Sequence, residues 1–252
     1  MKNYQVDKLN VNIYDTRSDM GAAAAADISA AFCALLEKKD EINVIFAAAP
    51  SQNEVLASLV ANKSIPWNRI NAFHMDEYIG LSKDAPQGFG NFLKEHIFGL
   101  APFKSVNYID ISATDPAAEC ARYEALLKEH PIDLIVMGIG ENGHIAFNDP
   151  PVANFKDTCL AKPVKLDEIC RQQQVNDGCF ATIDDVPTHA ITLTVPMFMR
   201  AGQLFCIVPA KTKAWAVKET LTGSIDEHCP ASILRTHECA SLYLDADSAS
   251  LL

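Results

Sequence analysis

The sequence contains no block of basic residues, and its 32 acidic residues outnumber its 21 lysines and arginines, giving a formal net charge of −11. A protein that binds nucleic acid needs basic side chains to neutralise phosphates, so this balance argues against DNA or RNA as a partner. A few local cations and backbone N–H groups are still enough to bind a small anion. The charge therefore argues against polyanions but not against phosphate esters.

The sequence also lacks a Cys-x-x-Cys pair, an apolar N-terminal segment and any obvious apolar run of the length that crosses a membrane. Its eight cysteines are scattered, which predicts reduced thiols in place of a disulfide framework. Residues 1–9 are polar and do not resemble the apolar core of a signal peptide. We therefore expect a cytoplasmic protein with no membrane partner.

Apolar runs alternate with helical patterns along the chain, and no linker or internal repeat interrupts them. Buried strands are predicted at 42–48, 69–75, 106–111, 132–137, 189–194, 204–208 and 241–244. Helices are predicted at 19–39, 53–62, 92–98, 115–129 and 212–221. Ser18 or Asp19 is expected to cap the first helix. This alternation is typical of an α/β fold with a mostly parallel sheet wrapped on both faces, as a single domain over residues 1–252.

Residues 150–187 do not fit this alternation, because they are polar and irregular. We expect short helices here, in a segment that covers part of the domain. The sequence leaves open whether this segment moves as a lid over a binding site.

The stretch Gly138–Pro150 carries the most chemical information. It reads Gly-Ile-Gly-Glu-Asn-Gly-His-Ile-Ala-Phe-Asn-Asp-Pro and directly follows the predicted strand 132–137. Ligands of open α/β sheets bind at the carboxyl ends of the strands, where this loop is expected to lie. His144 precedes Asp149 by five residues, and such a carboxylate can orient an imidazole and stabilise its charged form.

The predicted strand 69–75 also ends in acids, Asp76 and Glu77. If both strand ends meet, Asp76, His144 and Asp149 face one cleft, where a carboxylate can remove a proton from a carbon next to a carbonyl. Each residue alone has a simpler interpretation as a cap or turn former. Glu77 is expected to be structural, because neighbouring residues in a strand point to opposite faces. Taken together, the pattern favours catalysis.

Metal binding is a weaker alternative for the same region. His74, Asp76, His144 and Asp149 are the candidate ligands, but the sequence has no helical His-x-x-x-His pair and no tight ligand cluster. We therefore expect a site without metal.

A phosphate site is predicted where strands lead into helices. The turn containing Ser51 and Gln52 precedes a predicted helix, whose first N–H groups can bind an anion. Lys213 lies at another such junction, and Arg171 is a second candidate cation. For Lys211 we prefer the commoner interpretation of a solvated surface charge.

The stretches Phe73–Leu81 and Gly143–Pro150 closely resemble the glucosamine-6-phosphate deaminase (isomerase) family, with galactosamine-6-phosphate deaminase as a close variant. The likeness covers nearly the whole chain and includes Ala190–Thr194 and Lys213–Ala216. The motif continues as Ile-Ala-Phe-Asn, whereas the related 6-phosphogluconolactonases continue with a Thr-Ala-Ser-Leu-Phe type of string. The resemblance implies a Rossmann-like three-layer sandwich that needs no cofactor.

The resemblance also implies a reaction, in which an aminohexose 6-phosphate and water give a ketohexose 6-phosphate and ammonia. By position in the motif, His144 would open the pyranose ring with help from Asp149 and Asn142. Asp76 would then take the C2 proton and return it to C1 through an enolamine-type intermediate.

The substrate-binding positions match the family less closely. Lys213 corresponds to its phosphate-binding lysine, and Gly143 belongs to the substrate-binding part of the motif. Ser51 and Gln52 stand where the family usually has a Ser/Thr-Gly-Gly-Thr-Pro loop. Arg171 is the nearest counterpart of an arginine expected in the covering segment.

Two catalytic positions also differ from the common pattern. Position 142 is Asn where some members have Asp, and position 149 is Asp where Glu is usual. The shorter acid draws its carboxylate back by about 1.5 Å, roughly one C–C bond. We therefore predict that the chemistry is kept, and the sequence leaves the sugar open between glucosamine 6-phosphate and galactosamine 6-phosphate.

Other functions remain open from the sequence. One is a sugar-phosphate sensor that has lost turnover, and another is a hydrolase similar to the 6-phosphogluconolactonases. The sequence does not reveal whether copies of the chain form a homo-oligomer.

Overall fold

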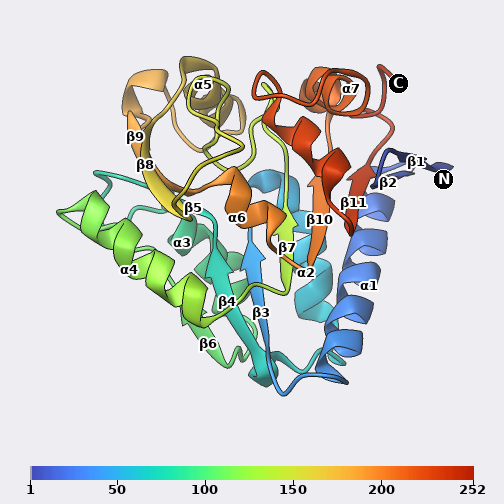
Figure 1. The fold of residues 1–252 in the computed structure, drawn as a ribbon, viewed down its shortest axis with the longest axis horizontal. Coiled ribbons are helices and arrows are strands. Elements are labelled where there is room, and N and C mark those ends of the chain that lie inside the picture. Colours follow the sequence, from blue (N-terminus) through green and yellow to red (C-terminus); the bar gives the residue numbers. More distant parts are fainter. Residues whose placement is uncertain (1) are drawn as a thin grey trace.

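The computed structural model describes residues 2–252, and its main feature is an eight-stranded sheet in the order β1-β2-β11-β10-β7-β3-β4-β6 (Figure 1). Its strands are β1 (Lys2–Val6), β2 (Leu9–Ile13), β3 (Ile42–Phe46), β4 (Ile70–His74), β6 (Ser105–Asn107), β7 (Leu134–Met137), β10 (Gln203–Val208) and β11 (Ala240–Leu244). All neighbours pair in parallel except β1 and β2. Six of the seven predicted strands lie in this sheet, which confirms the mostly parallel α/β fold.

The N-terminal hairpin of β1 and β2 was not predicted. Leu9 and Val11 of β2 are buried, and their neighbours Asn10 and Asn12 are less so. This alternation is the pattern of a strand with one buried face. It extends the sheet beyond β11, with Leu9 opposite Ala240.

A second, antiparallel sheet was also missed. It contains β5 (Asp76–Tyr78), β9 (His189–Leu193) and β8 (Ala161–Lys165) in that order. The strand predicted at 189–194 therefore exists but does not belong to the parallel sheet. An apolar run indicates a buried strand without indicating its partner, and here the partner is the continuation of the chain just after β4.

Helices cover both faces of the main sheet. They are α1 (Arg17–Leu36), α2 (Asn53–Ala61), α3 (Phe89–Leu93), α4 (Pro116–Glu129), α5 (Glu168–Asn176), α6 (Val195–Met199) and α7 (Ala214–Thr222). Side chains of β3 alternate between two hydrophobic clusters, with Val44 and Phe46 in one and Ile45 in the other. The first cluster also contains α1 and α2 residues, and the second contains α4 and α7 residues, which gives the expected three-layer sandwich.

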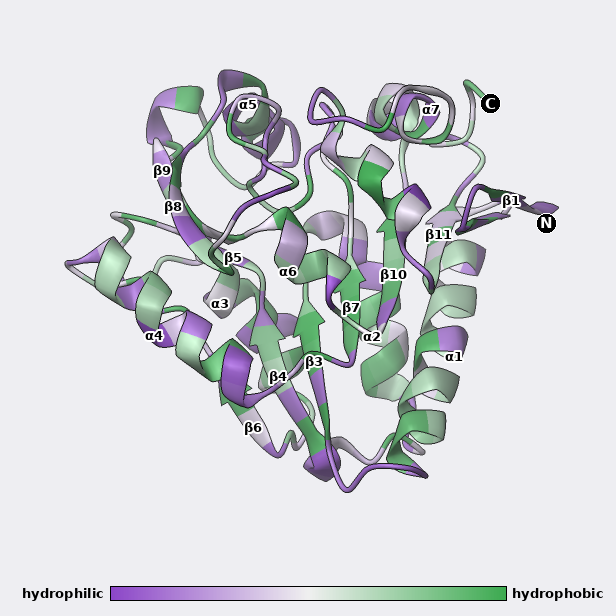
Figure 2. Ribbon diagram, in the orientation of Figure 1, coloured by the Kyte–Doolittle hydropathy of each residue, from purple (hydrophilic) through white to green (hydrophobic). Residues whose placement is uncertain are grey.

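The first helix differs from expectation in two ways. Thr16, not Ser18 or Asp19, is the N-cap, because its hydroxyl accepts a hydrogen bond from the Asp19 N–H at 3.1 Å. By length and composition alone, α1 could also cross a membrane, so our reading that no apolar run has that length was wrong. Figure 2 shows that α1 is mostly apolar along its length. Its buried residues, which include Ile28 and Phe32, belong to the hydrophobic core.

The segment 150–187 contains both expected and unexpected structure. The short helix α5 fits the prediction, whereas β8 does not. Because β8 pairs with β9, the segment is tied to the second sheet, and α5 lies above the carboxyl ends of the main strands (Figure 1).

Candidate active site

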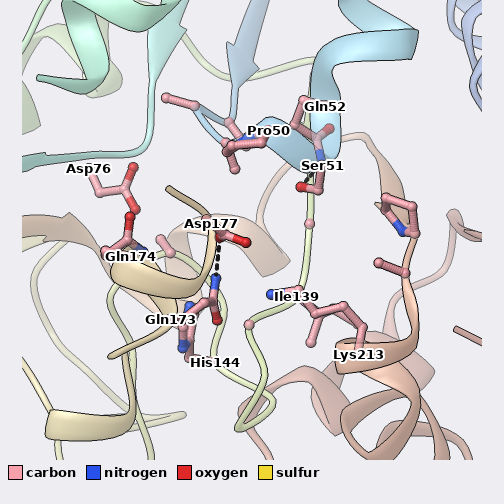
Figure 3. Close-up of a pocket in the computed structure, with 18 of the residues that line it drawn as sticks. Pro50, Ser51, Gln52, Asp76, Ile139, His144, Gln173, Gln174, Asp177 and Lys213 are labelled. Carbon is pink, nitrogen blue, oxygen red and sulfur yellow. Dashed lines mark hydrogen bonds between the residues drawn. The ribbon is translucent and has the colours of Figure 1, made fainter. Parts of the chain in front are cut away.

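A cavity lies at the carboxyl edge of the main sheet, where loops after β3, β4, β7 and β10 meet α5. The polar residues that line it are Arg17, Ser51, Gln52, Asp76, His144, Gln173, Gln174, Asp177, Thr212 and Lys213 (Figure 3). The structure thus brings together the two acid-bearing strand ends and the lysine that the sequence singled out.

Three side chains of the loop after β7 bind one another. The Nδ1 atom of His144 lies 2.7 Å from Oδ1 of Asn142 and 2.9 Å from Oδ1 of Asp149. The Asn142 amide in turn donates to the same Asp149 oxygen at 3.1 Å. An imidazole nitrogen between two acceptors carries the proton, so Nε2 is the nitrogen left to accept one. His144 lines the cavity, which makes it a candidate acid–base group there.

Asp149 is suited to support the imidazole. Burial by itself would raise the pKa of this fully buried carboxyl, but the charge of His144 and the hydrogen bonds from His144 and Asn142 bring it below its ordinary value. A carboxylate that stays ionised can stabilise the imidazolium form of His144.

Two glycines make room for this arrangement. A Cβ atom on Gly140 would lie 2.0 Å from Cε1 of His144, so only glycine leaves space for the ring. Gly143 has a positive φ of 82°, and a Cβ there would lie 2.6 Å from the sulfur of Cys229. Gly143 does not line the cavity, in contrast to its expected role in substrate binding; it shapes the turn that presents His144.

Asp76 is the second candidate acid–base group. Its carboxylate lines the cavity, is 7% exposed and makes no side-chain hydrogen bond within residues 2–252. Burial, followed by the nearby charge of Glu77, raises its pKa well above the ordinary value. A poorly solvated carboxylate without hydrogen-bond partners is a stronger base than one in water.

Glu77 has the structural role predicted for it. Its carboxylate accepts hydrogen bonds from the backbone N–H groups of Tyr78, Phe89 and Gly90 at 2.8–3.0 Å. Burial raises its pKa to about 7 despite these three bonds. Glu77 therefore attaches α3 to the strand that carries Asp76.

Three of the predicted phosphate-binding residues, Ser51, Gln52 and Lys213, lie on the opposite side of the cavity from Asp76 (Figure 3). Lys213 follows β10, is 5% exposed, and has a pKa lowered by burial although Asp177 and Glu141 favour its charge. The side-chain amide of Gln52 donates to the Ser51 hydroxyl at 3.0 Å and to a β10 carbonyl.

The backbone N–H groups of the turn at Ser51 and Gln52 are less available to bind an anion than the sequence suggested. The N–H groups of Gln52 and Asn53 already donate to the carbonyls of Ala49 and Pro50. An unpredicted cation, Arg17 at the start of α1, lines the cavity instead; it donates to the Pro50 carbonyl at 2.5 Å and pairs with Glu54 at 2.8 Å. No sequence pattern distinguished Arg17 from a surface charge.

Arg171 is not where the sequence suggested. Its guanidinium donates to the carbonyls of Ile183 at 2.6 Å and Val186 at 2.9 Å, and it does not line the cavity. The same helix contributes Gln173 and Gln174 in its place. A binding role for Arg171 is therefore not supported by this arrangement.

Comparison with known proteins identifies the family of the chain. The model of the family described as glucosamine-6-phosphate isomerases/6-phosphogluconolactonase matches residues 15–243. The chain belongs to this family.

Its relatives within the family include bacterial enzymes. A protein named glucosamine-6-phosphate deaminase from Listeria innocua is 36% identical over 212 residues, or 84% of this chain and 88% of that protein. One of the same name from Bacillus cereus is 35% identical over 217 residues, or 86% and 80% of the two chains.

Solved structures of family members have the same fold. A monomeric glucosamine-6-phosphate deaminase superposes with a TM-score of 0.86 at 28% identity, covering 96% of this chain and 99% of the other. The 6-phosphogluconolactonase of Thermotoga maritima has a TM-score of 0.76 at 23% identity, with 93% and 99% covered. The second likeness concerns the fold alone.

The four candidate metal ligands do not form one cluster: His144 and Asp149 lie together, and the His74 ring is engaged elsewhere. Both ring nitrogens of His74 are occupied, one by the Asp76 carbonyl at 3.0 Å and one by the Ile109 N–H at 2.8 Å. Within the described residues, the potential cluster is His144, Asp149 and Cys170, whose ligand atoms lie within 4.8 Å of one another. Burial raises the pKa of the Cys170 thiol well above its ordinary value, and a metal requires the thiolate. A site without metal stays our prediction.

Proposed function

We propose that the protein is an aminosugar-phosphate deaminase that converts glucosamine 6-phosphate and water to fructose 6-phosphate and ammonia. The observation that supports this most directly is the unpaired, buried Asp76 carboxylate, which shares one cavity with the His144–Asp149 pair and Lys213. The two named relatives at 35% and 36% identity add independent support.

Ring opening is the first step in this proposal. The Nδ1–H of His144 is held by Asn142 and Asp149, so Nε2 is free to accept the proton of the C1 hydroxyl. The resulting imidazolium, stabilised by the Asp149 carboxylate, then donates a proton to the ring oxygen. The product is the open-chain aldehyde.

Asp76 carries out the isomerisation. Its carboxylate takes the proton from C2, and the C1 oxygen gains a proton as the C2 ammonium loses one, which gives an enolamine-type intermediate. The carboxyl group of Asp76 then returns the C2 proton to C1. The product is a C2 imine, to which water adds, and the C–N bond breaks to release ammonia and leave the ketone. The raised pKa of Asp76 suits both proton transfers, because a base whose pKa approaches the working pH can take and return a proton.

Lys213, Ser51 and Arg17 bind the phosphate in this proposal. The Lys213 ammonium and the Ser51 hydroxyl lie on the side of the cavity away from Asp76, and the Arg17 guanidinium lines the same cavity. Together they supply positive charge and hydrogen-bond donors. Gln52 holds the Ser51 turn against β10 and acts indirectly.

The experiment that tests the function measures ammonia and ketohexose 6-phosphate released from glucosamine 6-phosphate, with galactosamine 6-phosphate in parallel. Release from the first sugar, coupled to fructose 6-phosphate formation, supports the proposal. Release from galactosamine 6-phosphate alone would assign the alternative epimer. Binding without release would indicate a sensor, and hydrolysis of a sugar lactone would indicate a hydrolase.

We also propose that the enzyme is cytoplasmic and acts on a small aminosugar phosphate without a cofactor. The proposal includes no nucleic-acid or membrane partner. Assembly into a homo-oligomer stays open, and size measurement in solution decides it.

A further inference from the structure

Gln174 of α5 is a buried polar residue to which the sequence assigned no role. It is 7% exposed and lines the cavity, and its side-chain amide forms no hydrogen bond with any residue of the described chain. Its amide atoms are not among the fully buried side-chain atoms that lack a partner, so they remain accessible from the cavity. Such a group facing a cavity is matched to a polar group of the ligand.

Its neighbours on α5 do not share this property. The Gln173 side chain accepts a hydrogen bond from the Glu141 N–H at 2.8 Å, so its carbonyl oxygen is already used. Gln172 is exposed and donates to Asn176 at 3.2 Å. Of the three consecutive glutamines, Gln174 is therefore the one available to a ligand.

The position of Gln174 identifies the part of the ligand that it contacts. Figure 3 shows the Gln174 and Asp76 side chains pointing toward one another, across the cavity from Lys213 and Ser51. Under the proposed function, Asp76 must reach the hydrogen on C2, while the phosphate lies near Lys213. Gln174 is consequently placed at the C1–C2 end of the open-chain sugar.

We infer that Gln174 recognises the C2 amino group of the substrate and so distinguishes aminosugar phosphates from hydroxyl sugar phosphates. Its amide oxygen accepts a hydrogen bond from the C2 ammonium. The neutral amide can do this without adding a second negative charge beside Asp76, where Glu77 already disfavours ionisation. This inference depends on the proposed function for the orientation of the sugar.

Binding of two inert alcohols tests the inference without depending on turnover. The probes are 2-amino-2-deoxyglucitol 6-phosphate and glucitol 6-phosphate, which differ only in the C2 substituent and have no carbonyl group. Calorimetry gives their dissociation constants for the wild type and three variants. Gln174→Leu removes the acceptor, Gln174→Glu keeps one, and Gln172→Leu is the matched control on the exposed side of the same helix.

We expect the wild type to prefer the amino alcohol and Gln174→Leu to reduce that preference about 10- to 100-fold, as for loss of a hydrogen bond to a charged group. Gln174→Glu and Gln172→Leu should keep the preference. An unchanged preference in Gln174→Leu, with thermal unfolding like that of the wild type, overturns the inference. So does a change in the ratio of glucosamine to galactosamine 6-phosphate affinities without a change in amine preference, since that places Gln174 near C4.

A different result would show that the proposed function itself is wrong. In that case the wild type releases no ammonia from either aminosugar phosphate. The role of Gln174 in amine recognition is then still decided by the binding of the two alcohols.

Discussion

The Nδ1 atom of His144 lies 2.9 Å from the Oδ1 atom of Asp149. Both residues belong to the loop after β7, where Asp149 is fully buried and His144 nearly so. The Asp149 side chain is shorter by one methylene than the glutamate that the family resemblance leads us to expect, yet this contact is made. The loop therefore accommodates the shorter acid, and Asn142 provides a second acceptor for the same ring nitrogen at 2.7 Å.

Replacing Asp149 by Asn should lower kcat about 100- to 10,000-fold, the range that general acid–base catalysis contributes. The neutral amide cannot stabilise the imidazolium of His144. The exposed Asp247→Asn serves as the control for loss of one negative charge. Ammonia-release kinetics, together with a circular dichroism spectrum that shows a folded protein, decide the outcome; wild-type kcat in Asp149→Asn would contradict the assignment.

Gly140→Ala should abolish turnover without unfolding the protein. The new Cβ would lie 2.0–2.2 Å from three ring atoms of His144, so the imidazole must move out of its place between Asn142 and Asp149. The three atoms nearest to the new Cβ belong to a side chain that lines a cavity and not to the backbone, which limits the cost in stability. Steady-state kinetics and thermal unfolding measure the two effects, and an active Gly140→Ala enzyme would show that the ring position is not required.

Asp76→Asn should reduce kcat at least about 100-fold, because the variant lacks the base that moves the C2 proton. In the wild type, burial keeps the pKa of Asp76 above the ordinary carboxyl value. The rate should therefore fall on the acid side at a higher pH than for an unperturbed aspartate. A pH profile of kcat/KM with its acidic limb near pH 4 would contradict the raised pKa.

The strand ends could be predicted from the sequence because they depend on local pattern. Each apolar run predicted a buried strand, and the abrupt change to polar residues at Asp76 and in the loop of His144 marked the carboxyl edge where ligands bind. Lys213 was predicted on the same grounds, as the cation at a strand-to-helix junction.

The groups that the sequence did not reveal depend on contacts between distant segments. Arg17 faces the cavity because α1 packs beside the turn at Pro50, and Gln174 does so because β8 pairs with β9 and thereby places α5. The sequence suggested Arg171 as the substrate-binding residue of α5, but its guanidinium donates hydrogen bonds to the carbonyls of Ile183 and Val186. None of these pairings is encoded in a short pattern.

Lys213→Gln should raise the KM for glucosamine 6-phosphate about 10-fold or more and change kcat less. A hydrogen bond to a charged group contributes about 1.5–3 kcal/mol. In the proposed function, the buried Lys213 ammonium binds the phosphate, far from the reacting carbons. Lys211→Gln is the matched control, since Lys211 is exposed two residues away and does not line the cavity. Equal KM values in the two variants would contradict a phosphate-binding role for Lys213.

His74 provides a prediction about stability that does not involve catalysis. Its ring is fully buried, with both nitrogens hydrogen-bonded in the neutral form, and burial lowers its pKa from 6.5 to about 4. Below pH 6.5 the His74 ring binds a proton in the unfolded chain but stays neutral in the folded chain. The folded state is therefore progressively destabilised as the pH falls from 6.5 to about 4. Glu77, with a pKa raised to about 7, has the opposite effect between its ordinary pKa of 4.5 and about 7.

Comparison of the wild type with His74→Gln separates these two contributions, because Glu77 is present in both proteins. Glutamine offers a donor and an acceptor but does not titrate, so the variant lacks the acid-induced loss. From pH 7 to pH 4 the wild type should lose about 3 kcal/mol more of its free energy of unfolding than His74→Gln does, since each pKa unit corresponds to about 1.4 kcal/mol. Urea unfolding curves at several pH values measure this difference. Parallel pH dependences in the two proteins would mean that His74 titrates normally and is not held neutral by burial.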